Sequence, residues 1–149
     1  MITELIKLYE RDLNRLEKEI NAFTEESNLW RIKGNIINSA GNLCLHIIGN
    51  LKTYIGKNLG NIHYLRNRDA EFSTTDIPRE SLIHEINKTK AVVSQSLAQM
   101  KATDLENTYK EDVLGYSMTN GYFLIHLSGH LNYHLGQINY LKTNFRGIS

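Results

Sequence analysis

The sequence predicts an all-α protein, a four-helix bundle with a long crossover between helices. Apolar residues recur every three or four positions through several long segments. At roughly 100° per residue, this spacing places them on one face of an α-helix. One proline and ten glycines in 149 residues indicate mostly regular structure with few breaks. No segment shows a convincing strand pattern, an internal repeat or a low-complexity tract.

Length and composition predict a single domain over residues 1–149, long enough to bury a core. Hydrophobic residues make up 41% of the chain, but no uninterrupted apolar run approaches the roughly 18 residues of a membrane span. No membrane association is therefore expected. The N-terminus enters an amphipathic pattern at once, without a basic region before an apolar core. No signal peptide is predicted, and a cytoplasmic location is the default.

Charge and cysteine content argue against other classes of protein. The net charge is +1, with basic and acidic residues spread along the chain. Nucleic-acid binding draws its affinity largely from clustered Lys and Arg, so it is not expected, although a local basic patch stays open. The single cysteine, Cys44, excludes an internal disulfide framework and a cysteine-rich zinc site. It is expected to be a small buried hydrophobe rather than a nucleophile.

The first helix is predicted over residues 2–23. Its apolar seam has a heptad spacing and consists of Ile6, Tyr9, Leu13, Leu16, Ile20 and Phe23. The opposite face is expected to be solvated and carries Glu4, Lys7, Arg11, Asp12, Lys18 and Glu19. Such a seam suits a helical bundle. A coiled coil is the alternative, although a seam this short in a chain of this size favours internal packing.

The second helix is predicted from about Ala40 to Asn58, with Asn38 or Ser39 as its N-cap. Its main apolar face holds Leu43, Ile47, Leu51, Tyr54 and Ile55. A narrow stripe of small and polar residues follows another side, namely Asn42, His46, Gly49, Asn50 and Thr53. This pattern fits a helix that is buried on most sides and lines a polar pocket.

Residues 59–77 are expected to form a loop or a broken helical extension. Arg66 and Arg68 could bind a substrate carboxylate through their forked donors, but a solvated or salt-bridged role is favoured. Pro78 marks the start of a third helix that runs to about Met100. The polar segment 101–121 is expected to be the long crossover, and the fourth helix is predicted over residues 122–144.

Two histidines of the fourth helix are candidate metal ligands. If Leu127 marks the centre of the core face, His134 falls about 20° from it, His130 about 60° and His126 about 100°. His130 and His134 are one turn apart and could hold one metal ion. Core or rim histidines with ordinary hydrogen bonds are an equally open interpretation. The metalloprotease motif is absent, because Leu131 stands where that motif needs glutamate.

A di-iron bundle is also disfavoured, since no glutamate has a histidine three residues later.

His46 lies in the middle of the polar stripe of the second helix. Periodicity leaves open whether it meets the other two histidines or is hydrogen-bonded to a neighbour such as Asn50. His63 has no partner at metal-ligand spacing, and His84 falls off its helix seam and is expected to be exposed.

Three blocks of sequence resemble the DinB-like superfamily, four-helix-bundle proteins named after a DNA-damage-inducible bacterial protein. They are Asn-Ser-Ala-Gly-Asn-Leu-Cys-Leu-His at 38–46, Arg-Asp-Ala-Glu-Phe at 68–72, and His-Leu-Asn-Tyr-His-Leu-Gly-Gln-Ile at 130–138. The resemblance covers essentially the whole chain. Its most specific element is the His-x-x-x-His-x-Gly-Gln-Ile of the last helix, combined with the lone histidine of the second.

The resemblance implies that His46, His130 and His134 bind a divalent metal, for which zinc and nickel both suit imidazole ligands. Gln137 and Asn50 are expected to hydrogen-bond these ligands, and Gly136 to allow a close helix contact at the site. Three imidazoles leave at least one coordination position open for water or substrate. No general base is identifiable, since no carboxylate lies within the 130–134 segment.

The resemblance also bears on activity. The superfamily members with an assigned activity look like thiol-dependent S-transferases and a maleylpyruvate isomerase, which use low-molecular-weight thiols such as bacillithiol or mycothiol. The expected function is therefore a metal-dependent enzyme that activates a low-molecular-weight thiol for transfer to a small-molecule electrophile, with a hydrolase as a variant. The alternative is a non-catalytic, stress-related metal-binding bundle acting as an interaction or structural homodimer. A homodimer is expected in either case. A catalyst should have an open coordination position facing a ligand-sized cavity, whereas a structural site should be capped by a fourth ligand.

Overall fold

The computed structural model describes residues 1–146, the last of them without its side chain. Four long helices make up the bundle: α1 (Ile2–Asn21), α2 (Ala40–Leu51), α4 (Arg79–Ala98) and α5 (Asn120–Arg146). A short helix, α3 (Arg68–Ser73), lies in the connection between α2 and α4. Short 3-10 turns, η1 (Glu26–Trp30) and η3 (Ala102–Glu106), lie in the other two connections. No strand occurs within residues 1–146, so the all-α prediction is confirmed.

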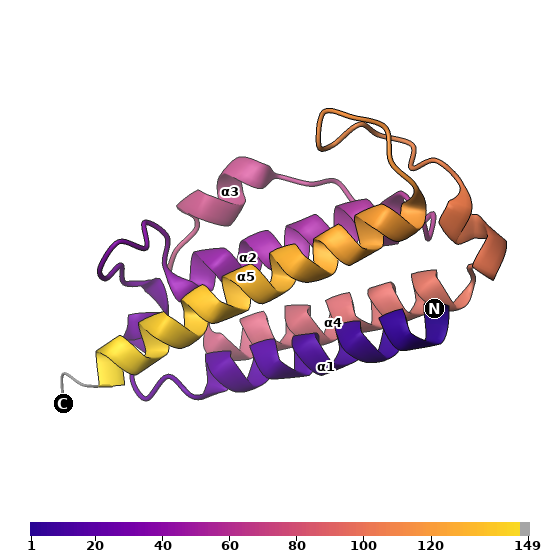
Figure 1. Cartoon of the computed structure of the whole chain (residues 1–149). Helices are drawn as coiled ribbons and strands as arrows, with labels where there is room; N and C mark the ends of the chain where they lie inside the picture. The colour runs from indigo at the N-terminus through magenta and orange to yellow at the C-terminus, as the bar shows by residue number, and fades with distance from the viewer. Residues whose placement is uncertain (147–149) are drawn as a thin grey trace.

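The four long helices form two pairs, α2 beside α5 and α1 beside α4 (Figure 1). Helix α1 also packs against α5, and α2 against α4, whereas α1 and α2 make little contact. They therefore lie on a diagonal of the bundle. The polar segment between α4 and α5 is the predicted long crossover, and α3 sits on the outer side of α2. The four-helix bundle is confirmed, with α3 as a fifth, short helix.

The core follows the predicted seams. On α1, Tyr9, Leu13, Leu16 and Ile20 are at most 1% exposed, and Ile6 lies at the edge of the core. On α5, the buried residues include Leu124, Leu127, Leu131, Ile138 and Leu141. Each fully buried side chain of this kind contributes roughly 1.5–3 kcal/mol to folding. Helix packing thus rests on apolar contacts that do not involve the histidines.

One residue assigned to the solvated face of the first helix is buried. The side chain of Asp12 is fully inaccessible, and Asn132 Nδ2 on α5 donates a 2.8 Å hydrogen bond to its Oδ2. Arg11 Nε donates to Oδ1 at 2.9 Å, and Arg15 lies 3.5 Å from the same oxygen. A carboxylate can be buried where such donors compensate its lost hydration. The prediction for Asp12 was wrong because the donor from α5 is 120 positions away in the sequence.

The second helix begins as predicted, because the Ser39 side chain accepts a hydrogen bond from the Asn42 amide and caps α2. Its last part, Lys52–Lys57, is a π-helical segment, η2, rather than a continuation of the α-helix. The wider turn closes with a 3.1 Å bond from the Asn58 amide to the Thr53 carbonyl. Such segments are rare and often accompany functional sites. This one follows directly after the polar stripe of α2.

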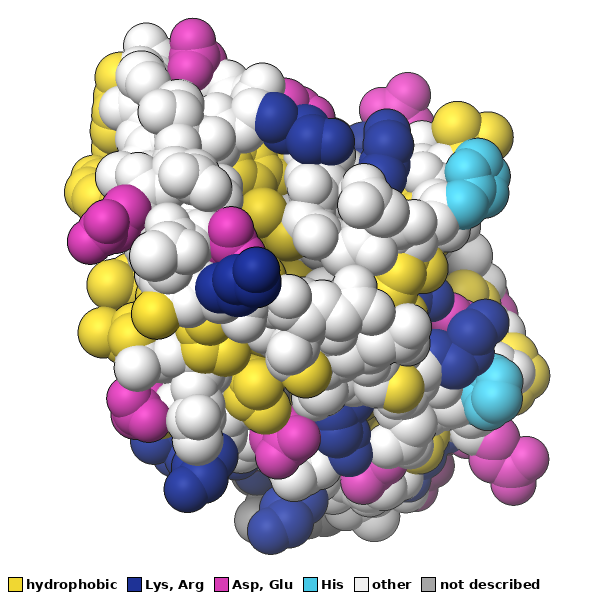
Figure 2. Space-filling model, turned by 90° about the vertical axis from the view of Figure 1, so that its right-hand side faces the viewer, with side chains coloured by type: hydrophobic (Ala, Val, Ile, Leu, Met, Phe, Trp, Pro, Cys, Tyr) yellow, Lys and Arg dark blue, Asp and Glu magenta, His cyan; other side chains and the backbone are white. Residues whose placement is uncertain are grey.

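Charged side chains on the face shown in Figure 2 are mixed in sign, with apolar side chains between them. No large patch of one sign gathers there, in keeping with the net charge of +1. Within residues 1–146, no helix combines the length and apolar character that crossing a membrane requires.

Candidate metal centre

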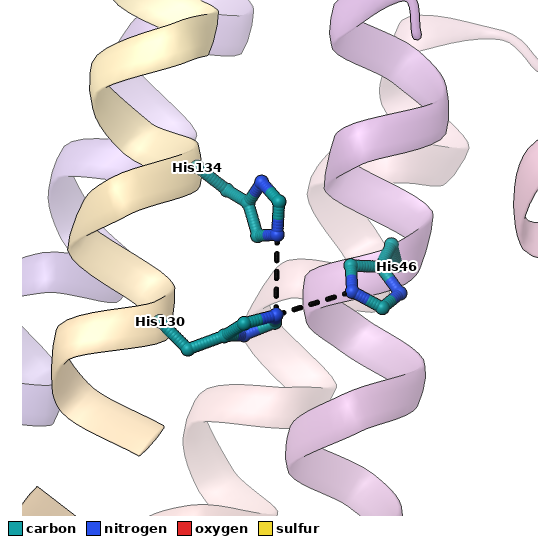
Figure 3. A group of neighbouring side chains, drawn as sticks. All are labelled: His46, His130 and His134. Carbon is teal, nitrogen blue, oxygen red and sulfur yellow. Dashed lines mark hydrogen bonds between the residues drawn. The ribbon is translucent and has the colours of Figure 1, made fainter. Parts of the chain in front are cut away.

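Three histidines from two helices point toward one another (Figure 3). His46 comes from α2, and His130 and His134 come from α5. His130 Nε2 lies 3.2 Å from His46 Nε2 and 3.1 Å from His134 Nε2. The donor nitrogens of all three lie within 4.8 Å of one another, so the group can hold a metal ion. The fold thus brings His46 to the pair that the sequence singled out on α5.

Hydrogen bonds at the outer ring nitrogens decide where two of the rings carry their protons. His46 Nδ1 donates to Glu71 Oε1 at 3.0 Å, and His134 Nδ1 donates to Gln137 Oε1 at 2.7 Å. A carboxylate and an amide oxygen only accept, so in the neutral rings both protons sit on Nδ1. The Nε2 lone pairs of His46 and His134 therefore both face His130 Nε2. Such outer partners are typical of metal-ligating histidines.

His130 cannot satisfy both lone pairs. A neutral imidazole has at most one proton on Nε2 and can donate to one neighbour at a time. Burial, followed by the proximity of His134 and His46, lowers the pKa of His130 to about 4. Burial also lowers the pKa of His134, partly offset by its bond to Gln137. Neutral imidazole is the form that binds metals, so the lowered pKa values of His130 and His134 favour metal binding.

Two of the three nitrogen–nitrogen distances are close to those around a tetrahedral metal ion. Zinc–imidazole bonds of about 2.0–2.1 Å at tetrahedral angles place ligand nitrogens about 3.3–3.4 Å apart. The two close contacts here are 3.1 and 3.2 Å. Neutral imidazole suits zinc, nickel and related divalent ions. The donor set and its geometry both fit a first-row divalent cation.

Glu71 is the functional residue that the sequence analysis missed. It is 6% exposed, and Arg66 grips it through two bonds, Nε to Oε2 at 2.8 Å and Nη2 to Oε1 at 3.0 Å. Burial alone would raise the pKa of Glu71, but hydrogen bonds from His46 and Arg66 outweigh it and lower that pKa. Arg66 Nη2 also lies 3.4 Å from His46 Nδ1, because both donate to the same oxygen. Glu71 is thus a fixed carboxylate acceptor for His46.

A glycine of α2 makes room for this carboxylate. A Cβ atom at Gly49 would lie 1.9 Å from Glu71 Oε2, far inside contact distance. Gly49 therefore permits α3 to lay Glu71 against α2. Both residues lie in stretches that the sequence had marked, Gly49 in the polar stripe and Glu71 in the 68–72 block. Helical periodicity had no means of showing that these stretches meet.

The remaining candidate residues fall in different places. Gln137 makes the expected hydrogen bond to His134. Asn50 does not bond His46, because the Nδ1 atom of His46 faces Glu71 and its Nε2 atom faces the other histidines. The close helix contact expected at Gly136 is wrong: a Cβ atom there would meet nothing within 4 Å, since this side of α5 faces outward.

The other three histidines stay outside the cluster. His126 is exposed and stacks on Phe123, with ring centroids 6.0 Å apart. His84 is exposed, as expected from its position off the helix seam, and His63 is exposed as well.

A cavity of about 270 Å³ adjoins the histidine cluster. His46 and His130 form part of its wall, beside Asn50, Arg66 and Arg68. In the part of the chain that the structure describes, no fourth His, Cys, Asp or Glu joins the three histidines. The position between the cluster and the cavity is therefore not capped by a protein ligand.

The fold and the histidine cluster together describe the class: a helical bundle with the fold of a DinB-like protein and a three-histidine group able to hold a metal ion. Within that class, the chain belongs to the family described as "Protein of unknown function (DUF1572)", whose profile matches residues 2–148. The chain is also similar to the crystal structure of a DinB-like protein from Bacillus cereus ATCC 10987. The TM-score is 0.72 at 19% sequence identity, over 94% of this chain and 89% of that chain. No curated protein matches the sequence.

Proposed function

We propose that this protein is a metal-dependent enzyme in which His46, His130 and His134 hold a divalent cation, zinc or nickel. The reaction proposed is transfer of a low-molecular-weight thiol to a small electrophile. One observation carries the proposal. Three imidazole nitrogens converge on a point that has no fourth protein ligand among the described residues and adjoins a cavity of about 270 Å³. Catalytic sites keep such a position open, whereas structural sites close it.

The chemistry proposed divides into what the cation supplies and what the chain supplies. When bound, the cation lowers the pKa of a thiol or water at the open position. The three imidazoles orient that position, and Glu71 keeps the His46 proton on Nδ1 by accepting its hydrogen bond. Transfer then forms a carbon–sulfur bond as the leaving group departs from the electrophile with its electron pair. No carboxylate lines the cavity among the described residues, so the thiol proton is released to solvent.

The thiol has to come from outside the protein. Cys44 is completely buried, and burial raises the pKa of its thiol far above the usual range. It is also the single cysteine of the chain. A protein nucleophile of this kind would need to be exposed and partly ionised. The only sulfur nucleophile compatible with this site is therefore a small thiol that enters the cavity.

Elemental analysis of untagged protein, purified without added metal, tests the metal centre. We expect near one zinc, nickel or similar ion per chain. His46→Ala, His130→Ala and His134→Ala should each lower metal affinity by orders of magnitude and keep most of the helical circular dichroism, because the seams supply the core. His126→Ala is the matched control and should retain its metal. Stoichiometric metal in the three variants, or wild-type protein that takes up no divalent ion, would contradict the assignment.

Activity separates the remaining alternatives. Metal-loaded protein should consume a small thiol in the presence of an electrophile such as chlorodinitrobenzene, and the His130→Ala variant should not. Turnover of ester or amide substrates without a thiol would favour the hydrolase. A protein that binds metal and turns over neither would favour the non-catalytic bundle. The predicted homodimer is tested separately by sedimentation equilibrium.

A further inference from the structure

The cavity beside the histidines is lined by both apolar and polar side chains. Leu114, Phe123 and Leu127 contribute apolar surface, whereas Asn50, Arg66 and Arg68 contribute polar groups. Its volume, about 270 Å³, lies just below the ~300–1,000 Å³ range of ligand pockets. It therefore suits a small ligand rather than an extended one.

Two arginine side chains give the lining of the cavity a positive charge. Arg66 is held by Glu71 in a two-pronged ion pair and is largely neutralised. Arg68 is exposed at the cavity and forms no ion pair within residues 1–146. No Asp or Glu lines the cavity among the described residues. A guanidinium without a carboxylate partner at the mouth of a pocket favours an anionic ligand, since its fork matches a carboxylate.

Asn50 supplies a second, independent feature. Its side chain is 7% exposed and lines the cavity, and its Oδ1 atom is buried without a hydrogen-bond partner in the described part of the chain. Leaving such a group unpaired costs roughly 1–3 kcal/mol. Asn50 also lies one turn after His46 on α2, so both face the same side of the helix. Asn50 and His46 both line the cavity.

We propose that the cavity is a recognition site for a small carboxylate that also carries a hydrogen-bond donor. The carboxylate pairs with Arg68, and an N–H or O–H group of the ligand donates to Asn50 Oδ1. This arrangement directs the remaining end of the ligand toward His46 and His130. The inference rests on the proposed function only in naming the ligand, which is either an amino-acid-like thiol or a carboxylate-bearing electrophile.

Calorimetric titration with N-acetylalanine tests the recognition site without any metal. This probe has a carboxylate and an amide N–H but no thiol. We expect metal-free wild-type protein to bind it, with about tenfold weaker binding by Arg68→Gln. Lys7→Gln, the same charge change on the exposed side of α1, should bind like the wild type. Equal affinity of the wild type and Arg68→Gln, or no binding at millimolar concentration, would overturn the proposal.

Asn50→Leu separates recognition from a structural role. Replacing an unpaired buried amide by an apolar group of similar size should leave the melting temperature equal or higher, while probe binding weakens several-fold. Propionate, which lacks the N–H donor, should bind the wild type and Asn50→Leu alike. A lower melting temperature with unchanged N-acetylalanine binding would assign Asn50 to the fold and overturn its place in the site.

A comparison in metal-loaded protein identifies the ligand. N-acetylcysteine should bind at least tenfold more tightly than N-acetylalanine if the carboxylate belongs to the thiol. Equal affinities would assign the carboxylate to the electrophile, and the recognition site stands in both cases. The first titrations use metal-free protein. A result in which Arg68→Gln binds N-acetylalanine as well as the wild type is therefore separate from a result in which the histidines bind no metal. Arg66 is left unchanged throughout, since it holds Glu71.

Discussion

Glu71, at the scale of single residues, links the fold to the histidine cluster. Its carboxylate receives one hydrogen bond from His46 and two from Arg66. It therefore fixes both the orientation and the proton position of the His46 ring. Carboxylate partners of this kind also make a metal-binding imidazole more basic. The hydrogen bonds from His46 and Arg66 together outweigh the effect of burial and lower the pKa of this carboxylate.

Replacing Glu71 with glutamine should lower metal affinity by about 10–100-fold, the usual effect of losing such a partner. Some stability should be lost as well, because Arg66 is left without its counter-ion. Competition with a chelating dye measures the affinity, and thermal melting measures the stability.

Glu85→Gln is the matched control for Glu71→Gln. It removes the 2.8 Å ion pair with Lys52, which involves none of the three histidines, and should affect stability without affecting metal binding. Equal metal affinity in Glu71→Gln and the wild type would show that Glu71 has no part in the site.

Glycines, at the scale of helices, have opposite roles in α2 and α5. Gly49 on α2 lies against the Glu71 carboxylate. Gly129 and Gly136 on α5 face open space, where an added Cβ would meet nothing within 4 Å. Glycine inside a helix costs roughly 0.5–1 kcal/mol relative to alanine. At Gly49 this cost is offset, because a larger residue would clash with Glu71. At Gly129 and Gly136 no such clash requires a glycine.

Gly136→Ala should therefore raise the free energy of unfolding by about 0.5–1 kcal/mol in urea titrations. Gly49→Ala should lower it, and should also weaken metal binding by displacing Glu71 from His46. The two substitutions are chemically identical and serve as controls for each other. Destabilisation by Gly136→Ala would instead show that this side of α5 is covered in solution, as the predicted homodimer would allow.

The bundle as a whole does not depend on the histidine cluster. Its core consists of the seams of the four long helices, and the cluster lies between α2 and α5 alone. Binding to the folded state alone stabilises a protein by roughly 2.7 kcal/mol when the ligand stands at a hundred times its dissociation constant. Metal binding should add to stability without creating the fold.

Chelation should therefore lower the melting temperature by several degrees and leave the helical circular dichroism at 25 °C nearly unchanged. Melting curves with and without EDTA measure both effects. His130→Ala should melt at the same temperature in both buffers. Loss of helical signal on chelation would mean that the metal is a structural element of the bundle.

The spacing of apolar residues predicted the features that depend only on the geometry of a single helix. Each helix orients its own side chains, so the seam of α1 and the shared face of His130 and His134 could be predicted from spacing. The resemblance to a known superfamily added His46, which spacing alone had left undecided. The four helices and their approximate ends are confirmed, apart from the π-helical end of α2.

The sequence by itself determined the helices, their buried faces and the pairing of two histidines one turn apart. Tertiary structure decided that Asp12 is buried, that Gly136 is exposed and that Glu71 rather than Asn50 holds His46. The physical reason is the range of the interactions. Helix geometry relates residues within about one turn, whereas Glu71 and His130 lie 25 and 84 positions from His46. Such residues meet only through the packing of α2 against α3 and α5.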